Sequence, residues 1–145
     1  MALKSLQREY TDLMAHPVPF GTVAPTNDPL VWKAYLVGPE DSPYEGGQFE
    51  LEMQFTGDYP ARGPKLKFIT SIFHANIARN GFICISLVSD WRPTDNMLTV
   101  MKAVSNLLAQ PDRNNAYYGG NLTDQQYRDE AVRWTQTYAQ KKCFN

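Results

Sequence analysis

The sequence is short of cysteine, histidine and net charge, and each shortage narrows the classes of protein that it can encode. Its 145 residues include two cysteines and two histidines and carry a net charge of −1. Two cysteines cannot build the disulfide framework of a small secreted domain, so we expect a reducing compartment, the cytoplasm or the nucleus. A balanced charge gives no general attraction to nucleic acid or to an anionic membrane. We therefore expect no nucleic-acid partner.

Motifs of a membrane segment, a nucleotide site or a metal site are also missing. No apolar run approaches the roughly 20 residues of a membrane-spanning helix, and charged residues follow Met1 too soon for the core of a signal peptide. The glycine pairs Gly46-Gly47 and Gly119-Gly120 fit neither common phosphate-binding fingerprint. The histidines and cysteines never fall at the paired spacing of zinc ligands. We expect no membrane partner, no metal and no cofactor.

The chain has the length of one domain, residues 1–145, which should bury roughly 70% of its unfolded surface. Its first segment, residues 2–15, has the apolar period of an amphipathic helix, and Pro17 ends that pattern. The apolar stripe of this helix is predicted to be Leu3, Leu6, Tyr10, Leu13 and Met14.

Three segments with strand patterns follow the first helix. Residues 31–37 are apolar apart from one charge, residues 49–55 alternate between apolar and polar side chains, and residues 65–68 alternate over a shorter length. Turn-rich connectors separate these segments. Because no helix lies between them, consecutive strands should pair as an antiparallel meander.

A long stretch without regular periodicity, residues 71–96, precedes the last two helices. Loops of that length in a compact domain usually carry function. An apolar helix is predicted from Met97 to Leu108, and a last helix after Thr123, whose spacing to Gln126 fits a capping box. The inward stripe of the last helix is predicted to be Tyr127, Ala131, Trp134 and Tyr138.

Cys84 lies within this irregular stretch. A thiolate is a strong nucleophile, so this residue can carry an acyl group as a covalent intermediate. Two other interpretations stay open from local sequence. Free cysteine is often a buried small hydrophobe, and His74 or His16 can be the base of a cysteine hydrolase.

Short motifs in a fixed order surround Cys84. They are Trp32, Gly38-Pro39, Ser42-Pro43-Tyr44-Glu45-Gly46-Gly47-Gln48-Phe49, Tyr59-Pro60, Pro64-Lys65, His74-Ala75-Asn76-Ile77, Asn80-Gly81, Ile83-Cys84, Trp91-Arg92-Pro93, Leu107-Leu108 and Trp134-Thr135-Gln136. With these motifs the chain resembles the ubiquitin-conjugating enzymes, which hold ubiquitin as a thioester between an activating enzyme and a ligase. The resemblance implies an α+β fold with an N-terminal helix, a four-stranded antiparallel meander, a catalytic loop and C-terminal helices.

The resemblance also implies roles for single residues. Cys84 matches the cysteine that carries the thioester. Asn76 matches the asparagine of the family's His-Pro-Asn motif, which donates to the developing oxyanion or braces the loop. Asn115 matches the gate position near the incoming lysine, where relatives commonly have an acid or a serine. His74 is expected to pack the loop through its ring.

Some positions depart from the family pattern. Ala75 replaces the motif proline, which should loosen the loop, so Ala75→Pro is expected to stabilise the protein by roughly 0.4 to 1 kcal/mol if the local φ fits. Lys102 lies where close relatives place leucine against the folded-back donor ubiquitin. The segment 116–123 is several residues shorter than in common relatives, so the third helix should be shortened to a loop.

The surface that faces the ligase in this family is only partly kept. Lys4 and Pro93 match the pattern. A basic, an aromatic and a small residue of well-known members are replaced by Ser5, Ala61 and Thr94. Ala61 offers little apolar area where an aromatic anchor commonly contributes about 2 kcal/mol or more. We therefore expect generic RING-type ligases to bind weakly.

The implied function is that of a monomeric carrier that accepts ubiquitin on Cys84 and transfers it to a lysine amine or a ligase. Its partners would be ubiquitin, the ubiquitin-activating enzyme, a ligase and protein substrate lysines. ATP would be used by the activating enzyme alone. Two alternatives stay open: a catalytically weakened variant that binds ubiquitin as a scaffold, and a carrier of another ubiquitin-like modifier.

Overall fold

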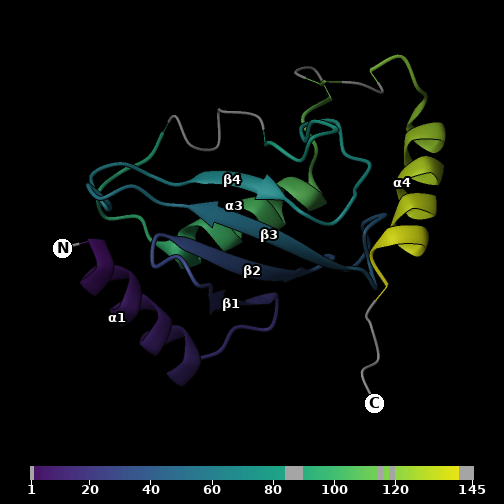
Figure 1. Ribbon diagram of the computed structural model, residues 1–145. Helices are drawn as coiled ribbons and strands as arrows, with labels where there is room; N and C mark the ends of the chain where they lie inside the picture. The colour runs from purple at the N-terminus through teal and green to yellow at the C-terminus, as the bar shows by residue number, and fades with distance from the viewer. Residues whose placement is uncertain (1, 84–89, 114–115, 118–119, 141–145) are drawn as a thin grey trace.

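The computed structural model describes residues 2–83, 90–113, 116–117 and 120–140. In chain order the elements are α1 (Ala2–Ala15), β1 (Gly21–Pro25), β2 (Val31–Val37), β3 (Gln48–Gln54), β4 (Lys65–Phe68), α3 (Met97–Ala109) and α4 (Asp124–Tyr138). The four strands form one antiparallel sheet in the order β1-β2-β3-β4 (Figure 1). The predicted α+β arrangement of an N-terminal helix, a four-stranded meander and C-terminal helices is confirmed.

The alternation of side chains in β2 and β3 gives the sheet one apolar face. Their register pairs Trp32 with Met53 and Leu36 with Phe49, and side chains two residues apart share a face. The buried residues of these two strands are Trp32, Ala34, Leu36, Phe49, Leu51 and Met53. The opposite face carries Lys33 and Glu50, which form a salt bridge of 3.3 Å.

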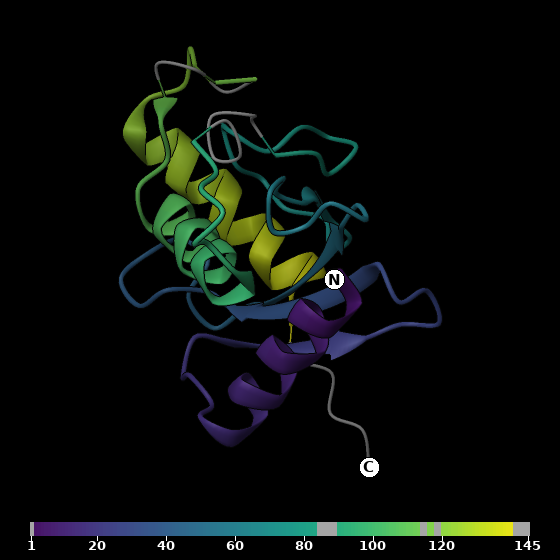
Figure 2. The same ribbon diagram turned by 90° about the vertical axis from the view of Figure 1, so that its left-hand side faces the viewer.

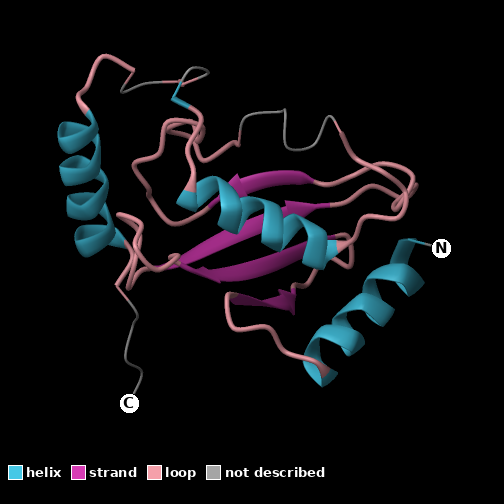
Figure 3. Cartoon of the chain, turned by 180° about the vertical axis from the view of Figure 1, so that it is seen from behind, coloured by secondary structure: helices cyan, strands magenta, loops and turns pink. Residues whose placement is uncertain are grey.

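Helix α3 covers the apolar face of the sheet (Figures 2 and 3). Asn96 caps its first turn, because the Asn96 side chain accepts a hydrogen bond from the backbone N–H of Thr99 at 3.0 Å. The buried residues of the helix are Met97, Val100, Met101, Val104 and Leu108. The apolar helix predicted between Met97 and Leu108 is confirmed.

Helix α1 packs at one end of the sheet through a narrower stripe than predicted. Ala2, Leu6 and Leu13 are buried, whereas Leu3 and Met14 are 51% and 45% exposed. At 100° per residue, Leu3 and Met14 lie about 80° and about 100° from the centre of the buried stripe. Including these two residues in the inward stripe was therefore wrong.

Helix α4 packs at the opposite end of the sheet (Figure 1). The predicted capping box is confirmed: the Thr123 hydroxyl accepts from the Gln126 N–H at 3.1 Å, and the Gln126 side chain accepts from the Thr123 N–H at 2.9 Å. Tyr138 is 53% exposed, so its place in the inward stripe was wrong. Thr135, one turn after Ala131, is buried instead.

The connection between α3 and α4 is a loop in its described parts. Residues 110–113, 116–117 and 120–123 contain no α-helix, which agrees with the predicted shortening of the third helix. Within the described ranges, no helix combines the length and hydrophobicity that a membrane span requires.

Candidate active site

A tight turn directs the chain toward Cys84. The Gly81 N–H donates to the Ala78 carbonyl at 2.8 Å, and the Phe68 N–H donates to the Gly81 carbonyl at 2.8 Å. Gly81 has a φ of 94°, and a Cβ there would lie 2.2 Å from the Phe68 carbonyl oxygen. Only glycine fits this turn without strain. The chain therefore reverses between residues 78 and 82.

The reversal brings Ile83 back beside Ile77, and these two residues form an antiparallel bridge. Ile83 is the last described residue before Cys84, and Ile77 directly follows Asn76. Cys84 itself and Asn115 lie outside the described residues. The described chain thus reaches the Cys84 segment from a position next to the His74–Ile77 motif.

His74 supports the loop through both ring nitrogens. Its Nδ1 accepts from the Asn76 N–H at 3.0 Å, so Nε2 carries the proton and donates to the Leu107 carbonyl at 2.8 Å. The ring is fully buried, and burial lowers the pKa of His74 to about 4, although the Leu107 bond opposes the shift. The imidazole is neutral at pH 7. The Nδ1 lone pair that a hydrolase base needs is already engaged.

Asn76 joins the loop to the chain that follows α3. Its side-chain amide donates to the Asp112 carbonyl at 2.8 Å and accepts from the Asp112 N–H at 2.8 Å. The side chain is 2% exposed. Two reciprocal hydrogen bonds fix the amide plane, which is what a bracing role requires.

Ala75 is held from two directions. Its N–H donates to the Tyr127 hydroxyl at 2.8 Å, and its carbonyl accepts from the Tyr117 N–H at 2.7 Å. Proline has no N–H and cannot make the first bond. The expected stabilisation by Ala75→Pro is therefore corrected to a destabilisation, because that expectation considered only the local φ and not the hydrogen bond of the Ala75 N–H.

Sequence reasoning missed Tyr127 and Tyr44 as residues of this site. Tyr127 was predicted only as part of an apolar stripe, and Tyr44 only as part of a motif. The signal was the absence of the motif proline: an alanine at position 75 adds a backbone N–H, which needs a partner if it is buried. Sequence alone does not say which side chain provides that partner.

Beyond the loop, Glu9 joins three segments at the opposite end of the sheet. One carboxylate oxygen accepts from the Met97 N–H at 2.8 Å, and both oxygens lie within 2.9 Å of the Tyr59 hydroxyl. Burial raises the pKa of Glu9, while these two donors oppose the shift. Trp91 donates from Nε1 to the Pro60 carbonyl at 2.8 Å. This bond joins the loop before α3 to the loop between β3 and β4.

The predicted partner-binding residues are carried by these segments. Lys4 lies on α1, Ala61 follows the Tyr59-Pro60 turn, and Pro93 and Thr94 precede α3; all four are exposed. Lys102 is exposed on α3. The structure therefore places the first four on three segments that Glu9 and Trp91 connect, and places Lys102 apart from them on the helix.

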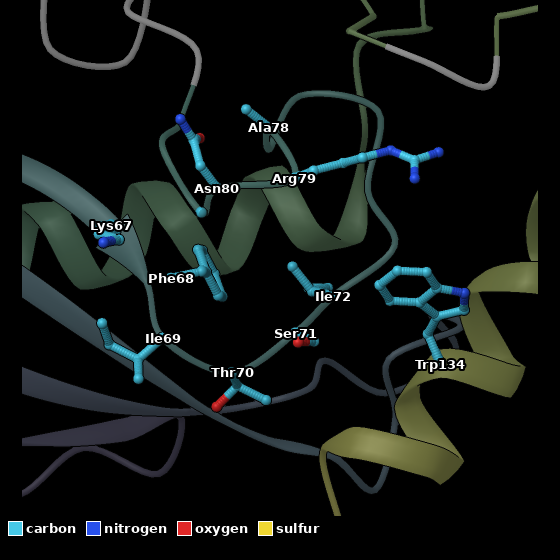
Figure 4. Close-up of a pocket in the computed structure, with 11 residues that line it drawn as sticks. Lys67, Phe68, Ile69, Thr70, Ser71, Ile72, Ala78, Arg79, Asn80 and Trp134 are labelled. Atoms are coloured by element: carbon cyan, nitrogen blue, oxygen red, sulfur yellow. The ribbon is translucent and has the colours of Figure 1, made fainter.

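A cavity of about 470 Å³ lies between the end of β4, residues 78–81 and Trp134 of α4 (Figure 4). Lys67 and Arg79 contribute positive charge to its wall. None of the predicted site residues that the structure describes lines this cavity. Within the same described ranges, no three histidine, cysteine, aspartate or glutamate side chains gather as metal ligands.

Comparison with known proteins assigns the family. The family model of the ubiquitin-conjugating enzymes matches residues 5–140. The chain is 38% identical over 146 residues to ubiquitin-conjugating enzyme E2 13 of Saccharomyces cerevisiae, with 96% of this chain and 95% of that protein covered. The crystal structure of a ubiquitin conjugating enzyme from Plasmodium yoelii superimposes with a TM-score of 0.90 at 30% identity and covers 97% of both chains. The chain therefore belongs to the ubiquitin-conjugating enzyme family, whose members are transferases.

Proposed function

We propose that this chain accepts ubiquitin from an activating enzyme as a thioester on Cys84 and passes it to a lysine amine or to a ligase. The observation that carries the proposal is the bridge between Ile77 and Ile83. Through this bridge the residue before Cys84 lies beside the residue after Asn76. The segments that contain Cys84 and Asn76 therefore begin at neighbouring positions in the fold.

In both chemical steps the main requirement on the carrier is the correct position of its reacting groups. In the first step the Cys84 thiolate attacks the thioester carbonyl on the activating enzyme, whose own thiolate leaves. In the second step a lysine amine attacks the new thioester, loses a proton to water or another base, and releases the Cys84 thiolate as the amide bond forms. ATP is consumed only upstream, by the activating enzyme.

Asn76 supports both steps through the loop. Its two bonds to Asp112 favour the bracing role, and a braced amide is also better placed to donate to an oxyanion than a free one. Asn115 is proposed to orient the incoming amine by hydrogen bonding. As a neutral amide it cannot stabilise the cationic form of that amine.

The partner surfaces follow from the exposed residues. Lys4, Ala61, Pro93 and Thr94 are proposed to contact a ligase, RING-type ligases among them, and Lys102 to face the donor ubiquitin. We propose that residues 1–145 act as one monomeric domain in the cytoplasm or nucleus, with protein lysines as acceptors and no nucleic-acid or membrane partner.

The test is a loading reaction with purified protein, activating enzyme, ATP and ubiquitin, analysed on gels with and without reductant. We expect a reductant-sensitive adduct in the parent and its absence in Cys84→Ala. An adduct that persists in Cys84→Ala would contradict the assignment.

The same reaction separates the two alternatives. A scaffold variant would bind ubiquitin noncovalently and yield no adduct with an activating enzyme that loads other carriers. A carrier of another modifier would load only when ubiquitin and its activating enzyme are replaced by that modifier and its own activating enzyme.

A further inference from the structure

The backbone N–H of Ala75 has to find a partner inside the protein. Ala75 is fully buried, and an unpaired buried N–H is strongly disfavoured. The partner is the hydroxyl oxygen of Tyr127 on α4, at 2.8 Å. These two residues are 52 positions apart in the sequence, so this bond ties the loop to the last helix.

The hydrogen bonds continue from Tyr127 to Tyr44 and return to the loop. The Tyr44 hydroxyl donates to the Phe73 carbonyl at 2.5 Å, and the two tyrosine hydroxyls lie 3.4 Å apart. A carbonyl only accepts, so the Tyr44 proton is committed to Phe73. The Tyr44 oxygen then accepts the Tyr127 proton. The direction is fixed from Ala75 through both hydroxyls to Phe73.

This chain of hydrogen bonds begins and ends at backbone groups of the same loop. We call the two hydroxyls with their partners at residues 73 and 75 the tyrosine clamp. It spans His74, whose ring also lies 5.6 Å from the Tyr44 ring. The clamp therefore fixes the backbone on both sides of His74, directly before Asn76.

The Tyr127 ring is itself held in place. The Arg113 guanidinium lies 4.7 Å from the ring centroid, and the Phe73 ring packs against it with centroids 5.4 Å apart. Arg113 in turn pairs with Asp124 at 2.9 Å at the start of α4. Stacking on the face of the ring adds to its fixation. These contacts hold the ring whose hydroxyl bonds to the Ala75 N–H.

We propose that Tyr127 is a positioning residue for Asn76 and for the loop that leads to Cys84. Its hydroxyl restrains the backbone at residue 75, which is the role expected of the motif proline in relatives. The proposal rests on the proposed carrier function. Proline at position 75 would remove the N–H and place a ring carbon where that N–H meets the Tyr127 oxygen. Ala75 and the Tyr127 hydroxyl therefore act as one unit.

The experiment measures discharge of preloaded protein to free lysine in a single turnover. We expect Tyr127→Phe to slow discharge about fivefold, the size of one buried hydrogen bond, with loading by the activating enzyme within about twofold of the parent. The matched control is Tyr138→Phe, which removes an exposed hydroxyl from the same helix and should leave discharge unchanged.

A double-mutant cycle with Ala75→Pro tests whether the two residues act as a unit. Each single substitution breaks the same bond, so the double variant should discharge no more slowly than the slower single variant. Single effects that multiply in the double variant would overturn the coupling. A rate for Tyr127→Phe equal to the parent rate would overturn the positioning role.

Hydrogen exchange separates failure of this proposal from failure of the carrier function. The Ala75 amide should exchange slowly in the parent and at least about fivefold faster in Tyr127→Phe, without any ubiquitin present. Equal exchange in both proteins would refute the clamp. A parent that never loads ubiquitin, but still protects Ala75, would refute the carrier function and with it the positioning role.

Discussion

The loop around Asn76 and the junction around Glu9 each join three segments of the chain, but they do so with groups of different charge. At the loop, neutral groups meet: the Asn76 amide, the His74 ring and the Tyr127 hydroxyl. At the junction, a carboxylate receives the Met97 N–H and the Tyr59 hydroxyl. The loop should therefore respond little to pH above about 6.5, the ordinary pKa of histidine, whereas the junction contains a group with a raised pKa.

The two regions also differ in what they present to partners. The loop residues 73–76 are buried, and their described hydrogen bonds are made within the chain. Ala61, Pro93 and Thr94, on the two loops that Trp91 joins, are exposed. The loop backbone is therefore held by contacts within the chain, whereas the side chains proposed to bind partners lie at the surface.

Acid should affect the loop first through His74. Its folded pKa of about 4 lies below the ordinary 6.5, so the unfolded state binds more protons as the pH falls. The stabilising contribution is complete above pH 6.5 and is lost between 6.5 and 4, by about 3 kcal/mol in all. Denaturant unfolding at a series of pH values measures this.

Glu9 acts with the opposite sign in the same experiment, because its pKa is raised and its protonation in the folded state favours folding as the pH falls. His74→Gln isolates the histidine contribution, and its unfolding free energy should fall less between pH 6.5 and 4 than that of the parent. His16→Gln, at an exposed histidine, is the control. Parallel curves for the parent and His74→Gln would contradict the neutral, buried assignment.

Asn76→Ala should reduce the free energy of unfolding by about 2 kcal/mol, because the Asp112 N–H and carbonyl both lose a partner. If the amide braces the loop, loading, discharge and thermal stability fall together. If its main role is at the oxyanion, discharge falls while loading and melting temperature stay near the parent values. Asn106→Ala, at an exposed asparagine of α3, controls for general effects.

At the junction, Glu9→Gln should reduce the free energy of unfolding by about 1 kcal/mol. The amide keeps an oxygen for the Met97 N–H but replaces the charged acceptor of the Tyr59 hydroxyl with a weaker one. Thermal melts at pH 7 measure the change, and loading of ubiquitin should stay near the parent level. A loss as large as that of Glu9→Ala would show that charge, rather than hydrogen bonding, holds this junction.

On the exposed surface, Ala61→Phe with Lys102→Leu should leave stability within about 0.5 kcal/mol. The aromatic ring restores an anchor and the leucine removes a cation from the surface proposed for the donor ubiquitin, so RING-stimulated discharge should rise about tenfold. Loading by the activating enzyme should not change. Strong stimulation of the unmodified protein by most ligases of a small panel would contradict this.

Local patterns predicted the parts of the fold that depend on neighbours in sequence. The Thr123–Gln126 capping box and the alternation in β3 are short-range features, and both were predicted correctly. Exposure of Leu3, Met14 and Tyr138 was not predictable from helical period alone. It depends on how wide a stripe the sheet covers, which is a property of packing rather than of the helix.

The polar contacts of the site depend on long-range pairing. Glu9 meets Tyr59 and Met97 across 50 and 88 positions, and Ala75 meets Tyr127 across 52. No spacing rule relates such residues. Asn76 was selected from sequence because of a motif, but its Asp112 partner, and therefore its bracing geometry, comes only from the fold.

The most direct test of the account is to map the covalent bond to ubiquitin by mass spectrometry. Cys84→Ser should form a reductant-stable oxyester, or none if the weaker nucleophile reacts too slowly; the parent thioester, digested at low pH without reductant, is mapped in parallel. We predict that the ubiquitin C-terminus is found on residue 84 in the parent, and also in Cys84→Ser where that variant forms an adduct. A bond in the parent on Cys143, Ser86 or Ser89 instead of Cys84 would contradict it.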